Sequence, residues 1–500
     1  MSAFNDLNGI PASGNHFTLT QILRDEWEFD GFVVSDWESM EEMIDHGFCK
    51  DMQSVAYKSV TAGVDMEMVS DAYWTELKGL VEQGVVSEEL VDERVANILR
   101  IKLRKGLFDR AFTQNDRQDV ILSEPHLQLT RKLAQQSFVL LKNRDHTLPL
   151  SDSLSIAMIG PLADAPRDQM GTWAMDGRVD RVVTPRQAFQ ERLENDRFHY
   201  APGLSSSRDT SHAEFDVAVT AAEQSDAVVM ILGEEQILSG EAKSRAFLDL
   251  PGAQAELFAA VAKTGKPVIT VIMAGRPLTF AAIAEKSDAV LYAWHPGTLG
   301  GPALADVLFG DVSPSGKLTT TFPRTVGQIP IYYNHRSTGR PPLESELGIP
   351  TGTPQDPRNF RSDYLDVDFT PAYPFGYGLS YTSFRYDNLV LSSPSMSKTE
   401  QIIISAEITN TGSMPGTEIV QLYIQDRYGS ITRPVRELKG FQRVTLNPGE
   451  SQTVSFELNA EQCSFYAMDN TPIIEPGTFS IWVAKDAASG LKGSFRITEK

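Results

Sequence analysis

The sequence predicts a multidomain protein in which α/β regions precede an all-β region. The chain has 500 residues, and because single domains usually run to about 100–200 residues, several cores are expected. As far as residue 325, continuous apolar strands alternate with helical stretches, which is typical of parallel sheets covered on both faces. Beyond residue 384, short strands with alternating side chains predict a small antiparallel sandwich.

The composition is that of a globular protein and excludes several classes of function. Sixty-six acidic residues against 45 basic ones give a formal net charge of −21, which disfavours nucleic acid as a partner. The two cysteines and eight histidines show no metal-ligand spacing, so we expect no metal and no other cofactor. No apolar run is long enough to span a membrane, and the first residues, MSAFNDLNGIPASGN, lack the pattern of a signal peptide.

The N-terminal region reads as two successive strand–helix units. Apolar residues at 31–35 predict a strand, an amphipathic stretch reaches Thr61, and 63–68 repeats the strand pattern. A helix is predicted from Ser87, its N-cap, to Leu103. Its apolar face is expected to consist of Leu90, Val91, Val95, Ile98 and Leu99.

A polar connector from Asp109 to about Pro125 predicts a domain boundary, and a helix-like run over 131–143 follows it. Strands and helices then alternate, as in a largely parallel sheet. The strands are expected at 155–160, 226–233, 267–275, 288–294 and 317–322, with helices such as 251–264 and 300–308 between them.

Residues 326–384 carry no sustained period and predict a long ordered connection. The pattern of the following region changes to short alternating strands with turn residues between them. These strands are expected at 401–412, 417–426, 451–459, 477–486 and 493–499.

Asp36 directly follows the apolar run GFVVS, at the point where a parallel strand ends and a loop begins. In barrel enzymes, the carboxyl ends of the strands hold the active site. The alternative is structural, because Ser35 and Glu38 are spaced as in a capping box that would start the next helix. The pattern leaves both interpretations open.

A second candidate carboxylate lies in the loop GEEQILSGEAKSRAFLDLPG, which follows the predicted strand at 226–233. Open α/β sheets place functional groups in loops at the carboxyl ends of their strands. Glu241 is one candidate there, and Glu234 and Glu235 are others, while a solvated acidic loop is the structural alternative. The loop pattern alone does not choose among them.

Ordered motifs through nearly the whole chain resemble glycoside hydrolase family 3, particularly its bacterial periplasmic β-glucosidase-like branch. They include NDLNGIPASGN, GFVVSDWESM, AGVDMEM, SFVLLKNRDHTLPL, IAMIGPLAD, SGEAKSR, VIMAGRPL, ADVLFGDVSPSGKLTTTFPRTVGQIPIYY, YPFGYGLSYTSF and ELKGFQRVTLNPGESQTVSF. The resemblance implies a TIM-like barrel, an α/β sandwich domain and a fibronectin type III-like β-sandwich. It implies periplasmic or secreted localisation as well.

The resemblance also implies a retaining, exo-acting β-glucosidase that needs no metal, with β-xylosidase or a related exo-glycosidase as the alternative. Asp36 would be the nucleophile and Glu241 the acid/base, on opposite sides of one cleft. Trp37 and Arg245 would contribute to substrate binding, Trp37 by offering the sugar ring an apolar face and Arg245, near Glu241, by tuning its loop. The substrate would be a small oligosaccharide or an aryl β-glucoside.

The chain departs from the family pattern in its barrel, since only residues 1–108 would belong to it and a (β/α)₈ barrel takes about 250 residues. We therefore expect an N-terminally truncated family member with impaired activity. It would be a gene fragment, the product of a misassigned start site, half of a split protein that a barrel fragment complements, or a chain completed by a homodimer partner. A non-catalytic fragment that binds carbohydrate weakly is the alternative of another class. The expected domains are 1–108 (C-terminal part of the barrel), 109–125 (linker), 126–325 (α/β sandwich), 326–384 (connector) and 385–500 (fibronectin type III-like).

Overall fold

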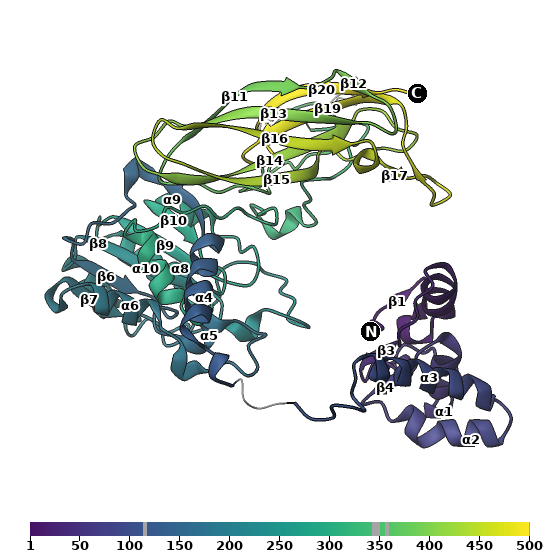
Figure 1. Cartoon of the computed structure of the whole chain (residues 1–500). Helices are drawn as coiled ribbons and strands as arrows, with labels where there is room; N and C mark the ends of the chain where they lie inside the picture. The colour runs from purple at the N-terminus through teal and green to yellow at the C-terminus, as the bar shows by residue number, and fades with distance from the viewer. Residues whose placement is uncertain (114–117, 343–350, 356–359, 500) are drawn as a thin grey trace. The chain divides into compact units, whose positions relative to one another are not determined.

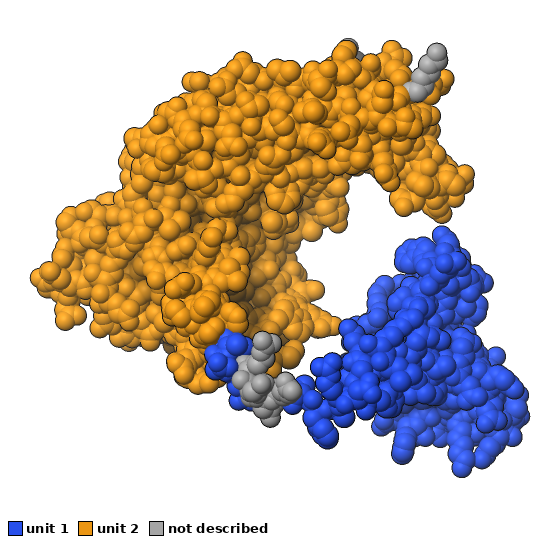
Figure 2. All heavy atoms as spheres, in the orientation of Figure 1, with its two compact units in different colours: residues 1–121 blue, residues 122–500 orange. Residues whose placement is uncertain are grey.

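The chain forms two compact units, Met1–Ile121 and Leu122–Lys500, which Figure 2 distinguishes by colour. The computed structural model describes residues 1–113, 118–342, 351–355 and 360–499. Each unit has hydrophobic clusters of its own. Within the described residues, no helix combines the length and apolar character that crossing a membrane requires.

The first unit packs helices around one parallel strand pair, β3 (Val34–Trp37) and β4 (Met66–Met68). The helix between them, α1 (Met52–Ala62), begins with a capping box at Asp51 and ends at Gly63, whose φ of 116° favours glycine. The remaining elements are β1 (Asp6–Leu7), β2 (Ile10–Pro11), η1 (Ala12–Gly14), η2 (Phe17–Glu26), η3 (Glu41–Met43), η4 (Tyr73–Leu77), α2 (Lys78–Glu82), α3 (Glu88–Arg104) and η5 (Gln118–Val120).

Helix α3 confirms the predicted N-cap, because the Ser87 hydroxyl accepts a hydrogen bond from the Leu90 amide at 3.2 Å. Its predicted apolar face is only partly covered. Leu90 and Val91 pack against the core of the unit, whereas Val95 and Leu99 are 45% and 41% exposed. The hydrophobic period therefore located the helix correctly, but only its first turns contribute apolar side chains to the hydrophobic core.

One buried carboxylate, Asp65, connects the elements of this unit. Its oxygens accept from the Val33 amide at 2.6 Å, from Arg24 at 2.5 Å and from the Asn97 side chain at 2.9 Å. Arg94 lies 3.4 Å away and is itself buried. These partners come from η2, from the residue before β3 and from α3. Asp65 therefore fixes the amino-terminal end of the strand pair against these helices.

Replacing Asp65 with alanine is expected to destabilise the first unit by about 3–5 kcal/mol, because two buried or half-buried arginines would lose their counter-charge. Urea unfolding of the chain, followed by hydrogen exchange in α1 and α3, measures this change. Asp30→Asn is the control, since Asp30 also pairs with an arginine, Arg104, but at the solvent-exposed surface. Equal loss of stability in both variants would contradict the role of Asp65.

The second unit contains a six-stranded sheet of order β5-β10-β9-β8-β6-β7, and Figure 1 labels its strands from β6 to β10. All neighbours are parallel except β5 and β10, and one hydrophobic cluster covers each face. The strands are β5 (Val139–Asn143), β6 (Ile156–Ile159), β7 (Phe198–Ala201), β8 (Ala227–Gly233), β9 (Val268–Met273) and β10 (Ala289–Tyr292). The helices are α4 (Glu124–Ser137), α5 (Pro166–Met170), α6 (Pro185–Arg192), α7 (Phe215–Glu223), α8 (Gln254–Ala262), α9 (Ala281–Lys286) and α10 (Gly300–Leu308).

Three expectations for this sheet need correction. The helix-like run over 131–143 is half strand, because α4 ends at Ser137 and the buried residues after it form β5. Residues 317–322 form no regular strand; Phe322 makes only an isolated bridge with Tyr373 in the connector. Strand β7 was not expected, since its side chains are mostly half-buried and give no apolar run.

The C-terminal part is a β-sandwich of a three-stranded sheet, β11-β13-β16, and a five-stranded sheet, β12-β20-β19-β14-β15. Alternate residues of β13 are buried, as the period-2 pattern predicted. Strands β11 and β15 were not predicted. The strands are β11 (Phe384–Leu391), β12 (Ser395–Met396), β13 (Gln401–Asn410), β14 (Gly416–Asp426), β15 (Glu437–Leu446), β16 (Ser451–Asn459), β17 (Phe465–Tyr466), β18 (Pro472–Ile473), β19 (Gly477–Ala484) and β20 (Leu491–Ile497).

Candidate active site

Asp36 lies inside β3 rather than just beyond it. The parallel ladder continues past it, because Trp37 pairs with Met68 and the Glu38 amide donates to the Met68 carbonyl at 3.0 Å. The half-buried carboxyl of Asp36 accepts one hydrogen bond, from the Trp37 amide at 2.8 Å, and makes no other within the described part of the chain. One carboxylate oxygen therefore remains available at the carboxyl end of the strand pair.

The capping-box interpretation of this segment is wrong. The Ser35 hydroxyl accepts from the Met68 amide at 2.8 Å and donates to the Asp36 carbonyl at 3.0 Å, so it joins the two strands. Glu38 has a φ of 56°, which is not a helical conformation. Ser35 thus supports the strand end that presents Asp36.

Strained backbone conformations occur at the carboxyl ends of β3 and β4, close to Asp36. Glu38 after β3, and Val69 and Asp71 after β4, all have left-handed φ values, between 56° and 68°. For a β-branched residue such as Val69 this conformation is a true outlier, and residues of this kind cluster at functional sites. This signal supports a functional strand edge and was not available from the sequence.

Trp37 follows Asp36 and is 58% exposed. Its indole is therefore free to offer an apolar face to a ligand. Within the first unit, the chain thus brings together an accessible carboxylate and an accessible aromatic side chain on consecutive residues of one strand.

Glu241 occupies the tip of the loop between β8 and α8, as the sequence indicated. The Lys243 amide donates to the Gly240 carbonyl at 3.3 Å, which closes a tight turn around Glu241. Gly240 has a φ of 107° and Ala242 one of 56°, and a Cβ on Gly240 would lie 2.8 Å from Thr172. The glutamate side chain is exposed and makes no hydrogen bond to any of the described residues.

The other two glutamates of this loop are engaged. Glu234 is fully buried and pairs with Arg245 at 2.5 Å and Arg276 at 3.2 Å. Glu235 pairs with Arg208 at 3.1 Å, and this arginine lowers the pKa of the Glu235 carboxyl. Among the three glutamates, Glu241 is the one with a carboxyl open to a ligand.

Arg245 therefore has partners that the sequence did not reveal. Its guanidinium binds Glu234 and donates to the Asp249 carbonyl at 2.9 Å, so it lies beneath the loop. The suggested contact of Arg245 with substrate remains a prediction. Glu234 and Arg276 were missed as a pair, although both follow buried strands of the same sheet, β8 and β9, which is a usable signal.

A hollow of about 390 Å³ adjoins the Glu241 turn and is lined by residues that include Ser239, Gly240, Trp173 and His295. Trp173 is 63% exposed. Burial lowers the pKa of His295, so its ring is neutral at pH 7. The second unit thus offers an aromatic side chain and a concave surface next to Glu241.

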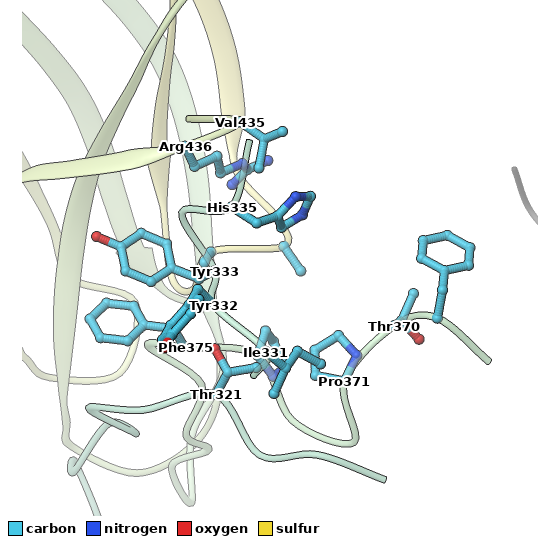
Figure 3. Close-up of a pocket in the computed structure, with 14 residues that line it drawn as sticks. Thr321, Ile331, Tyr332, Tyr333, His335, Thr370, Pro371, Phe375, Val435 and Arg436 are labelled. Carbon is cyan, nitrogen blue, oxygen red and sulfur yellow. The ribbon is translucent and has the colours of Figure 1, made fainter. Parts of the chain in front are cut away.

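A different pocket, of about 260 Å³, lies where the connector meets the β-sandwich (Figure 3). Tyr332, Tyr333 and Phe375 give it an apolar wall, and Arg436 and His335 lie at its rim. The described residues that line it include neither aspartate nor glutamate. General acid/base hydrolysis with two carboxylates therefore does not fit this pocket.

Three family models match the chain. Residues 1–101 match the glycosyl hydrolase family 3 N terminal domain, residues 138–381 its C-terminal domain, and residues 418–487 a fibronectin type III-like domain. The predicted fold class, with its α/β parts and its fibronectin type III-like sandwich, is confirmed by these matches.

Individual relatives extend along almost the whole chain. A periplasmic β-glucosidase of Salmonella typhimurium is 40% identical over 99% of this chain and 67% of its own length. A β-xylosidase of Formosa agariphila is 38% identical over 98% of this chain and 68% of its own length. This chain therefore spans about two thirds of the length of either relative.

A solved structure gives the same result for the fold. The β-glucosidase of Listeria innocua, with structures in complex with isofagomine, glucose and laminaribiose, matches with a TM-score of 0.91 and 38% identity. The match covers 99% of this chain and 68% of the Listeria chain. With an accessible carboxylate presented by the first unit and another by the second, and with matches of this extent, the chain belongs to glycoside hydrolase family 3.

Proposed function

We propose that this chain serves the reaction of a retaining, exo-acting β-glucosidase, with Asp36 as the nucleophile and Glu241 as the general acid/base. The glucosidases of Salmonella and Listeria support the reaction. One observation carries the assignment of Glu241. Arginines bind the carboxylates of Glu234 and Glu235, whereas the side chain of Glu241 is exposed and makes no hydrogen bond to the described residues.

The chemistry requires two carboxyl groups with different tasks. Asp36 attacks the anomeric carbon and forms a covalent glycosyl-enzyme, while Glu241 protonates the departing glycosidic oxygen. The Glu241 carboxylate then takes a proton from the water that releases the sugar. In a working retaining enzyme the two carboxyl groups would lie about 5–5.5 Å apart.

The neighbouring residues would assist binding. Trp37 would place its indole against the sugar ring, and a terminal β-glucosyl unit of a small oligosaccharide or aryl glucoside would be the substrate. β-Xyloside hydrolysis is the second candidate, which the Formosa relative supports. A periplasmic or secreted location is proposed from the Salmonella relative.

The first unit also supports a candidate of another class, a non-catalytic protein that binds carbohydrate weakly. Its described residues contain one parallel strand pair, β3 and β4, whereas a closed barrel of this type needs eight strands. Sugar-binding side chains from further strands would then come from a homodimer partner or from a complementing barrel fragment.

Hydrolysis of p-nitrophenyl β-glucoside and β-xyloside tests both candidates, with the 500-residue chain and with a hybrid protein. In the hybrid, the part of the Salmonella relative that this chain does not match is joined to the chain. We expect the hybrid to prefer the glucoside. The chain alone should be at least about 100-fold slower, because two lost hydrogen bonds of about 1.5 kcal/mol each have this effect.

Circular dichroism and thermal unfolding serve as the controls that both proteins are folded. A folded hybrid that cleaves neither glycoside would overturn the proposed function. A preference for the xyloside would replace glucosidase with xylosidase, and equal rates for chain and hybrid would contradict the need for further barrel strands.

A further inference from the structure

Three charged side chains, Glu234, Arg245 and Arg276, form a largely buried group that is hydrogen-bonded to the backbone of the Glu241 loop. Glu234 follows β8 directly and its carboxyl is 0% exposed. Arg245 binds one of its oxygens at 2.5 Å, and Arg276 lies 3.2 Å from the other. The two arginine side chains are themselves 18% and 17% exposed.

The sheet explains why these residues meet. Strands β8 and β9 are parallel neighbours, with Gly233 opposite Met273. Glu234 and Arg276 therefore leave the same edge of the sheet, one residue and three residues beyond that pair. A buried carboxylate needs several charge-assisted hydrogen bonds to be tolerated, and the two guanidinium groups supply them.

The remaining donors of the arginines bind the loop backbone on both sides of Glu241. Arg276 Nη2 donates to the Leu238 carbonyl and, at 2.7 Å, to the Lys243 carbonyl. Arg245 Nη2 donates to the Asp249 carbonyl at 2.9 Å. The buried carboxylate of Glu234 thus orients both guanidinium groups. Arg276 holds the loop backbone three residues before Glu241 and two residues after it, and Arg245 holds it at Asp249.

The ends of the loop are fixed separately. The buried Gln254 side chain accepts from the Gly233 amide at 2.8 Å and donates to the carbonyls of Gly233 and Pro251 at 2.8 and 3.0 Å. The Thr172 hydroxyl contacts the carbonyls of Gln236 and Ser239 at 2.5 and 2.6 Å. The turn around Glu241 lies between these anchors and is exposed.

We propose that Glu234, Arg245 and Arg276 form a positioning triad that holds the Glu241 turn in place for proton transfer. The proposal rests on the proposed function of Glu241. It gives Arg245 a role beneath the loop in place of a contact with substrate. None of the three residues needs to touch the sugar, since they act through the carbonyls of Leu238, Lys243 and Asp249.

Hydrogen exchange of the 500-residue chain tests the triad without relying on activity. The loop amides of Leu238, Ser239 and Lys243 are hydrogen-bonded within the loop, at 3.0, 3.2 and 3.3 Å. Glu234→Gln is expected to speed their exchange by about tenfold or more, because the arginines lose the charge that orients them. Exchange in β8 and β9 should stay as in the parent chain.

Asp306→Asn is the matched control. Like Glu234, Asp306 is a buried carboxylate paired with an arginine, Arg131, but its partner lies on α4 rather than in the loop. It should leave the exchange of 236–243 unchanged. If Glu234→Gln does not fold, Arg276→Lys replaces it, since lysine keeps the positive charge but cannot reach both carbonyls with a rigid fork.

Unchanged exchange of 236–243 in folded Glu234→Gln or Arg276→Lys would overturn the triad. An equal rise of the exchange rate in the loop and in β8 and β9 would also overturn it, because such a rise indicates general destabilisation. In the hybrid protein, Glu234→Gln should lower kcat/KM for an alkyl glucoside at least about tenfold more than for dinitrophenyl glucoside, whose leaving group needs no proton. A Glu241→Gln variant with full activity would refute the role of Glu241 while leaving the exchange result intact.

Discussion

Replacing Asp36 with asparagine is expected to lower glucoside hydrolysis by the hybrid protein by roughly 10⁴- to 10⁶-fold, the effect of removing a nucleophile from an enzyme that depends on it. Asparagine has nearly the same shape and still accepts from the Trp37 amide, as Asp36 does at 2.8 Å. It cannot form the covalent glycosyl-enzyme, because its amide is a poor nucleophile. The loss should therefore appear in kcat, with thermal stability unchanged.

Glu38→Gln is the control for this substitution, because it also converts an acid to an amide, two residues further along, on an exposed side chain. It should keep hydrolysis within a few-fold of the parent. Mass spectrometry of the protein treated with an activated fluoroglucoside should place the trapped sugar on the peptide with Asp36. A sugar attached to another peptide, or a similar loss in both variants, would refute Asp36 as the nucleophile.

The sequence was sufficient to place Asp36 near the carboxyl end of a strand and Glu241 in the loop that follows a buried strand. An apolar run followed by an acidic residue located the carboxyl end of β3, and the loop after β8 was recognised from the long buried strand before it. Boundaries were less certain, because the ladder of β3 and β4 continues through Asp36 and depends on pairing with a distant segment. The motif resemblance, rather than periodicity, selected Glu241 among three glutamates.

Other features depend on contacts between distant residues and were not predictable from local pattern. Glu234 looked like an alternative acid, yet it is neutralised by Arg276, which lies 42 residues away in the sequence. The run over 131–143 has apolar residues that fit either a helix or a strand, and its pairing with β10 decided for a strand after Ser137. The left-handed conformations at Glu38 and Val69 likewise have no counterpart in the sequence pattern.

Replacing Glu241 with glutamine is expected to give a loss of activity that depends on the leaving group. With a methyl or cellobiosyl leaving group, the hybrid protein should lose up to about 10⁴-fold in kcat/KM, the upper range for general acid catalysis. With 2,4-dinitrophenyl glucoside, the loss in kcat/KM should be small, because this leaving group departs as a stable anion. Stopped-flow measurement should instead show a burst of phenolate followed by slow turnover.

The burst follows from the second task of Glu241. Once the glycosyl-enzyme on Asp36 has formed, no carboxylate is available to activate water, so the intermediate accumulates. Added azide, which needs no base, should restore turnover and yield the β-glycosyl azide, since two inversions retain configuration. Glu235→Gln is the matched control, because Glu235 lies in the same loop but is held by Arg208. Equal losses on both classes of leaving group, with no effect of azide, would show that another residue transfers the proton.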